Sequence, residues 1–146
     1  MKDNKFINKQ KGFTLIELVV VVAIIVVLAT IVASNIVVYI KKSGDAKIRA
    51  SMDSIYTTST VYFESNGNYA SLFANSKILS IMASIQTLSS YSVTTGISAD
   101  NKTWCACAQL IGISTNANSY CVDSTGFRKE NSAYCSGRCN ASSCNS

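Results

Sequence analysis

The chain has 146 residues, enough for one domain, and a net charge of +5 at pH 7. The first twelve residues carry +3 of that charge, from four lysines against one aspartate, so residues 13–146 carry only +2 and no specific nucleic-acid site is expected. The absence of His and Pro excludes a His-based triad and a His metal ligand. No catalytic constellation is left, and we expect neither an enzyme nor a cofactor.

An apolar run dominates the first quarter of the chain. From Leu18 to Ile40 it contains no charge, no Gly and no Pro, and it exceeds the roughly 20 residues that a helix needs to cross a bilayer. The four lysines before it follow the positive-inside rule, which predicts a cytoplasmic N-terminus and export of the rest. Glu17 lies just before the run, and a carboxylate that enters lipid is expected to have a partner.

The junction Lys11-Gly12-Phe13-Thr14-Leu15-Ile16-Glu17 resembles the leader junction of type IV prepilins and pseudopilins. The resemblance implies that a prepilin peptidase recognises Lys11 and Gly12, cuts after Gly12 and methylates the new amino terminus at Phe13. It further implies that Glu17 pairs with the Phe13 amine of a neighbouring subunit. Residues 1–12 are then a removed leader, residues 13–40 a transmembrane and filament-core helix, and residues 41–146 a globular head.

The same resemblance implies a structural subunit, major or minor, of a type IV pilus-like filament. Its partners are further copies, related minor pilins, the peptidase and, before assembly, membrane lipid. The protein is expected to cross the inner membrane once and then to join an extracellular filament at the cell surface.

Two other functions are open at this point. A pseudopilin of a type II secretion or competence apparatus would have a calcium-loaded head and no surface fibres. An exported binding protein with a signal anchor would keep Met1 and place Glu17 among lipid headgroups.

Helical spacing continues beyond the apolar run. One set of residues recurs at intervals of three and four: Ile48, Met52, Ile55, Ser59 and Tyr62. Asp45, Arg49 and Asp53 are assigned to the other face. We predict one helix from about Thr14 to about Ser65, ended by the stop signal in residues 66–68.

The remaining elements predict an α+β, pilin-like fold, in which one long N-terminal helix packs on a small antiparallel sheet. A second helix is expected around residues 78–88, capped by Asn75 or Ser76. Period-two patterns predict three strands, over residues 91–95, 103–111 and 119–123. The face of the second strand that carries Trp104 is expected to pack on the long helix. Residues 128–146 form a polar tail without a core of its own.

Six cysteines lie in the last 42 residues, at Cys105, Cys107, Cys121, Cys135, Cys139 and Cys144. In an exported head all six are disulfide candidates, and sequence alone does not choose among the 15 pairings. The strand register favours Cys107 with Cys121 over Cys105 with Cys121, and Cys105 would then reach into the tail.

Two metal sites are weighed and not adopted. Thiolates of the Cys-Ala-Cys and Cys-x3-Cys segments could hold zinc, although structural zinc sites usually use Cys-x2-Cys pairs. Asp100, Asn101 and Asp123 could contribute to a calcium site, but acids in such loops are more often turn formers.

Overall fold

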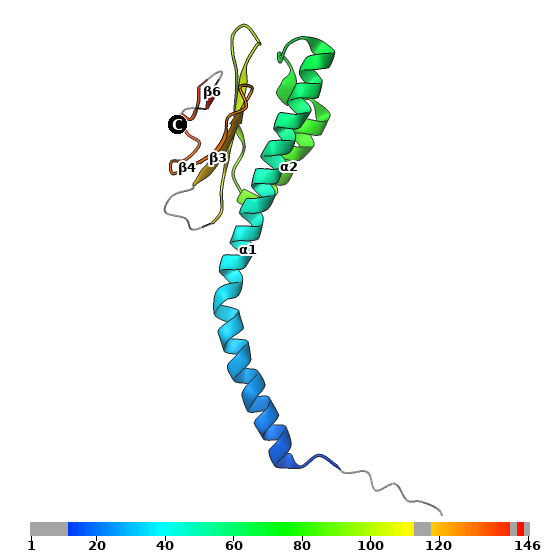
Figure 1. Ribbon diagram of the computed structural model, residues 1–146, viewed down its shortest axis with the longest axis vertical. Coiled ribbons are helices and arrows are strands. Elements are labelled where there is room, and N and C mark those ends of the chain that lie inside the picture. The colour runs from blue at the N-terminus through cyan, green and yellow to red at the C-terminus, as the bar shows by residue number, and fades with distance from the viewer. Residues whose placement is uncertain (1–11, 113–117, 141–142, 145–146) are drawn as a thin grey trace, which may run out of the picture. The chain divides into compact units, whose positions relative to one another are not determined.

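The computed structural model describes the chain except for residues 1–11, 113–117, 141–142 and 145–146, and except for the side chains of residues 33–35 and 140. The chain divides into two compact units, residues 1–37 and 38–146, each of which is described by itself. Helix α1 (Leu15–Asn66) begins in the first unit and ends in the second (Figure 1). These bounds confirm the prediction of one long helix.

The described part of the first unit consists of the beginning of α1 and the three residues before it. The stretch Leu15–Val32 has a mean hydropathy of 3.2 and is long and apolar enough to span a membrane. None of its residues is buried. The hydroxyl of Thr30 donates a hydrogen bond to the carbonyl oxygen of Val27 at 2.7 Å, so this polar group is satisfied within the helix, as an apolar environment requires.

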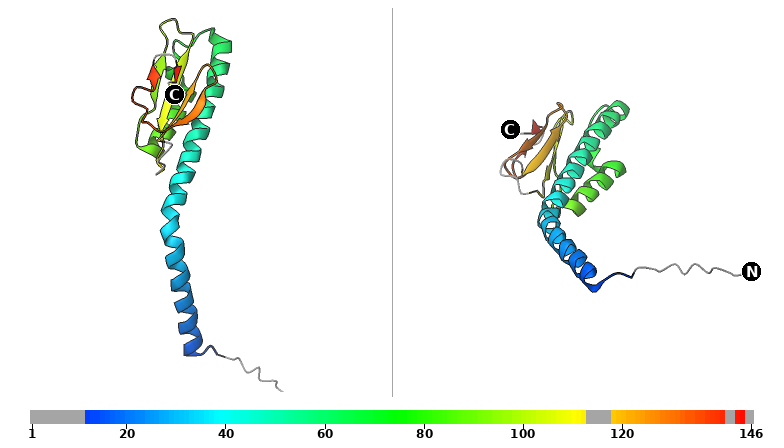
Figure 2. Two further views of the ribbon diagram at one scale, coloured as in Figure 1. Left: turned by 60° about the vertical axis from the view of Figure 1, so that its left-hand side comes forward. Right: turned by 60° about the horizontal axis from the view of Figure 1, so that its bottom comes forward.

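The second unit packs helices against an antiparallel sheet. Its helical elements are the rest of α1, the 3-10 helix η1 (Leu72–Ala74) and α2 (Ser76–Ser89). The sheet has the strand order β1 (Thr94–Ile97), β2 (Trp104–Gln109), β3 (Ser119–Asp123) and β4 (Arg128–Asn131). A hairpin of β5 (Cys139–Asn140) and β6 (Ser143–Cys144) lies on the face of the sheet turned away from α1 (Figure 1, Figure 2). The α+β prediction is confirmed.

The main core lies between the helices and one face of the sheet. Side chains of α1, η1 and α2 that are fully buried are Ile48, Met52, Ile55, Leu72, Ile78 and Ile85. From the sheet, Trp104, Ala106 and Val122 face them and are also fully buried. The rings of Tyr69 and Phe73 meet Trp104 edge-on, with centroids at 6.4 and 6.0 Å. The predicted contact between the Trp104 face and the long helix is confirmed.

Three residues of this unit mark the end of a helix, cap a helix or lie where a helix packs closely on a neighbouring side chain. Gly67 has a φ of 70°, and its N–H donates to the carbonyl of Phe63 at 2.7 Å, which closes α1. Asn75 caps α2, since its side chain accepts from the N–H of Lys77 at 3.0 Å. At Gly44 an added Cβ would overlap the end of the Ile111 side chain, which would have to shift to admit a larger residue.

Two strand predictions need correction. The first strand is β1, three residues later than predicted, because α2 ends with Ser90 at a φ of 61° and pairing with β2 begins only at Thr94, opposite Cys107. Residues 128–146 were predicted to be a polar tail, but their first four residues form strand β4. Its sequence, Arg-Lys-Glu-Asn, has no alternation of apolar and polar residues. Its four residues pair with β3 at the edge of the sheet, where charged side chains remain in water.

Candidate functional site

The residues of the predicted processing junction lie before the helix. Gly12, Phe13 and Thr14 are exposed and outside any helix, and the side chain of Phe13 is 85% exposed. Lys11 lies outside the described residues. The bond between Gly12 and Phe13 therefore joins two exposed residues that precede α1.

Thr14 and Glu17 form a reciprocal cap at the start of α1. The Glu17 carboxylate oxygen Oε2 accepts from the backbone N–H of Thr14 at 2.9 Å and from its hydroxyl at 2.8 Å. In return, the N–H of Glu17 donates to Oγ1 of Thr14 at 3.3 Å. This is a capping box, which the spacing Thr-x-x-Glu could have revealed and which our sequence analysis missed. In the single chain, Glu17 thus has an intramolecular partner.

Both faces of the central strands are covered, and the cysteines occupy the face opposite α1. The cysteine side chains of β2 and β3 lie on this face, packed with Phe127 and with the cysteines of the tail. Disulfides join Cys105 to Cys139 and Cys107 to Cys135, each with Cα atoms 5.6 Å apart.

The favoured pair Cys107–Cys121 is wrong in the structure, although the register behind it is right. Cys107 does lie directly opposite Cys121 in the β2–β3 ladder. The bridge nevertheless runs to Cys135, because the tail folds back across this face and brings its own sulfur to Cys107. Cys105 reaches into the tail, as the register implied.

Cys121 and Cys144 remain as buried thiols. The sulfur atoms of Cys107, Cys121 and Cys135 lie within 4.8 Å of one another, which gives the zinc alternative three sulfurs in one place. Since Cys107 and Cys135 are joined, only Cys121 of these three can supply a thiolate. The cluster therefore favours disulfide chemistry over a metal.

The carboxylates of the calcium alternative are engaged in turns. Asp100 accepts from the hydroxyl of Ser98 and the N–H of Lys102, and these bonds hold the pKa of Asp100 below its usual range. Asp123 is buried and accepts from the backbone of Thr125 and Phe127. Both acids thus act as turn formers.

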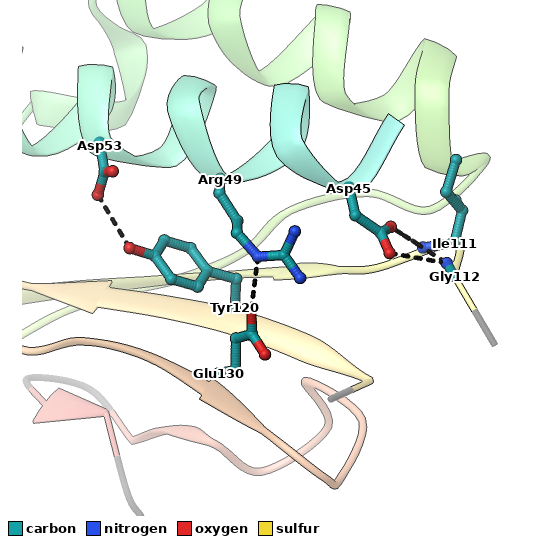
Figure 3. Close-up of polar contacts among 7 residues, drawn as sticks. All are labelled: Asp45, Arg49, Asp53, Ile111, Gly112, Tyr120 and Glu130. Atoms are coloured by element: carbon teal, nitrogen blue, oxygen red, sulfur yellow. Dashed lines mark hydrogen bonds and ion pairs between the residues drawn. The ribbon is translucent and has the colours of Figure 1, made fainter. Parts of the chain in front are cut away.

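A polar stripe on α1 faces the sheet instead of solvent, which corrects the assignment of Asp45, Arg49 and Asp53 to the other face (Figure 3). Three contacts between the residues drawn there hold the helix to the sheet and to the segment that follows β2. Asp45 accepts from the N–H groups of Ile111 at 2.7 Å and Gly112 at 3.1 Å, Arg49 pairs with Glu130 at 2.6 Å, and Asp53 accepts from the hydroxyl of Tyr120 at 3.1 Å. Burial raises the pKa of Tyr120, and the bond to Asp53 raises it further. The spacing of four residues places all three side chains on one stripe.

These features define a class of protein. A long N-terminal apolar helix, an antiparallel sheet and a C-terminal region tied by disulfides fit an α+β pilin fold. Residues 7–33 match the family model of the prokaryotic N-terminal methylation motif. The chain therefore combines a match to this motif with an arrangement of helix, sheet and disulfides that fits a pilin fold.

A curated relative points the same way. The chain is 35% identical over 75 residues to the type IV major pilin protein PilA of Myxococcus xanthus (strain DK1622). The aligned part is 51% of this chain and 34% of the relative, so the chain spans about a third of that protein's length. No solved structure matches the chain. The resemblance to type IV pilins is thus confirmed.

Proposed function

We propose that the chain is a subunit, major or minor, of a type IV pilus-like filament and that it assembles through helix α1. The observation that carries this proposal is the overlap of the methylation motif at residues 7–33 with the apolar stretch Leu15–Val32, none of whose residues is buried in the single chain. An exposed apolar surface of this extent requires a cover. Lipid covers it before assembly, and the same helix of neighbouring copies covers it afterwards.

Processing prepares the N-terminus. The peptidase cuts after Gly12, removes the lysine-bearing leader and methylates the amine of Phe13. The exposure of Gly12 and Phe13 and their position before the first helical residue support this step.

Assembly then uses the charge of Glu17. The carboxylate pairs with the Phe13 amine of an adjacent copy, so that the correct register neutralises a charge that would otherwise be unpaired in an apolar core. Thr14 holds the carboxylate at the positive end of the helix dipole until that partner arrives.

The head, residues 41–146, faces the outside and supplies the surface contacts of the filament, such as adhesion or DNA uptake. Disulfides at Cys105–Cys139 and Cys107–Cys135 suit an exported domain, because such bonds persist in oxidising compartments.

Filaments sheared from cells test the proposal. We expect the chain in the sheared fraction by mass spectrometry and along the fibres by immunogold electron microscopy. A strain lacking the chain is the control for antibody specificity. Recovery of the chain only from membranes, with no labelled fibres, would contradict a pilus subunit and favour the pseudopilin.

A further inference from the structure

Two buried thiols lie next to each other on the face of the sheet that α1 does not cover. Cys121 is in the middle of β3 and Cys144 is in β6, and their side chains are 1% and 8% exposed. Both side chains belong to one buried cluster, together with Cys105, Cys107 and Cys135. Cys144 also lies over β2, with its sulfur 4.0 Å from the carbonyl oxygen of Ala106. The two sulfurs are therefore neighbours in a packed interior.

Two independent connections hold Cys144 in this place. Within the hairpin, Cys144 lies opposite Cys139, which is bonded to Cys105 of β2. On the other side, the backbone N–H of Cys144 donates to Oδ2 of Asp123 at 3.0 Å. Asp123 follows Cys121 by two residues in β3, so both side chains project from the same face of the sheet. The fold thus brings Cys144 to Cys121 from two directions.

We propose that Cys121 and Cys144 form a third disulfide, which fixes strand β6 to the central strand β3 and pairs all six cysteines. This proposal rests on the proposed export of the head, because the oxidant is an external disulfide of the kind that thiol oxidoreductases carry in oxidising compartments. The two thiols lose two protons and two electrons, the S–S bond forms, and the external disulfide is reduced to two thiols.

The exchange takes place before the tail closes over β3, because Cys121 is only 1% exposed in the folded head. One of the two cysteines, as the thiolate, attacks the external disulfide, forms a mixed disulfide and releases one external thiol. The thiolate of the other cysteine then attacks the sulfur of the first and releases the second external thiol, which leaves the Cys121–Cys144 bond.

A competing isomer has the same number of bonds. The sulfur of Cys121 lies within 4.8 Å of those of Cys107 and Cys135, so exchange could give Cys107–Cys121 with Cys135–Cys144. In the structure Cys107 is joined to Cys135, which leaves Cys121 and Cys144 to pair with each other.

Peptide mapping separates the two isomers. The full-length chain in detergent is reduced, reoxidised in a glutathione buffer, alkylated in denaturant and digested with trypsin and chymotrypsin. The variant Cys105→Ala/Cys139→Ala leaves one cysteine in each of four fragments, residues 105–110, 121–127, 135–138 and 139–146. We expect fragment 121–127 to be linked to 139–146, and 105–110 to 135–138. Links from 105–110 to 121–127 would overturn the proposal.

The unmodified sequence gives a second readout that needs no substitution. We expect no alkylated cysteine after reoxidation, against six in the reduced control. Alkylation at both Cys121 and Cys144 would overturn the third bridge. The matched variant Cys121→Ala/Cys144→Ala should keep the other two bridges and also show no alkylation. Glutathione supplies the oxidant in this experiment, so alkylated Cys121 and Cys144 would count against their pairing even if the head is exported. Export itself is tested separately by the sheared filaments.

Discussion

Replacing Glu17 with alanine is expected to abolish surface filaments while the chain still inserts into the membrane. The substitution removes the one charged residue of the stretch Leu15–Val32 and makes the stretch more apolar, so insertion persists. Assembly fails because the amine of each Phe13 loses its acceptor in the neighbouring copy. Electron microscopy of fibres and quantification of the chain in the membrane fraction measure the two effects in the same cells.

The capping box makes a sharper version of this experiment possible. Glu17→Gln keeps an oxygen that can accept from Thr14 but removes the charge, whereas Thr14→Val removes the hydroxyl and keeps the charge. We expect Glu17→Gln to lose filaments and Thr14→Val to retain them. Filaments at the normal level from Glu17→Gln would show that Glu17 acts only as a helix cap.

Asp45→Ala is expected to destabilise the head by about 2–3 kcal/mol, because it leaves the N–H groups of Ile111 and Gly112 without their acceptor in a largely buried place. For a unit of this size the midpoint of thermal unfolding should fall by roughly 10–20 °C. The fluorescence of Trp104, which is fully buried and the only Trp in the chain, reports this transition in the full-length protein in detergent.

Two substitutions on the same polar stripe are controls for Asp45. Asp45→Asn keeps one acceptor oxygen and should cost less than Asp45→Ala. Asp53→Ala removes one hydrogen bond from the hydroxyl of Tyr120, and the free energy of unfolding should fall by only about 1 kcal/mol. Equal losses from Asp45→Ala and Asp53→Ala would contradict the special role of the two backbone contacts.

Local patterns were enough to predict the helices and most of the sheet. The bounds of α1 follow from uninterrupted helical spacing and from Gly67, which adopts the left-handed conformation that ends helices. The prediction of Cys107 opposite Cys121 followed from strand alternation and the centre of the loop, and the β2–β3 ladder confirms it. These features depend on residues that are close in sequence.

The features that were missed depend on contacts between distant segments. In the sequence Asp45 resembles an ordinary exposed helical acid. Only the fold shows that the N–H of Ile111, 66 residues later, donates a hydrogen bond to it. The strand β4 has no apolar pattern and exists because β3 offers an edge. The partner of Cys107 is in the tail, and only the path of the tail across the sheet brings Cys135 to it.

The most direct measurement is the mass of the N-terminal peptide of the mature chain, isolated from sheared filaments or from membranes. A chain processed as proposed begins at Phe13 with a methylated amine. A peptide that still begins at Met1 and contains the lysines of the leader would contradict processing, and with it the pairing of Glu17 that the filament requires.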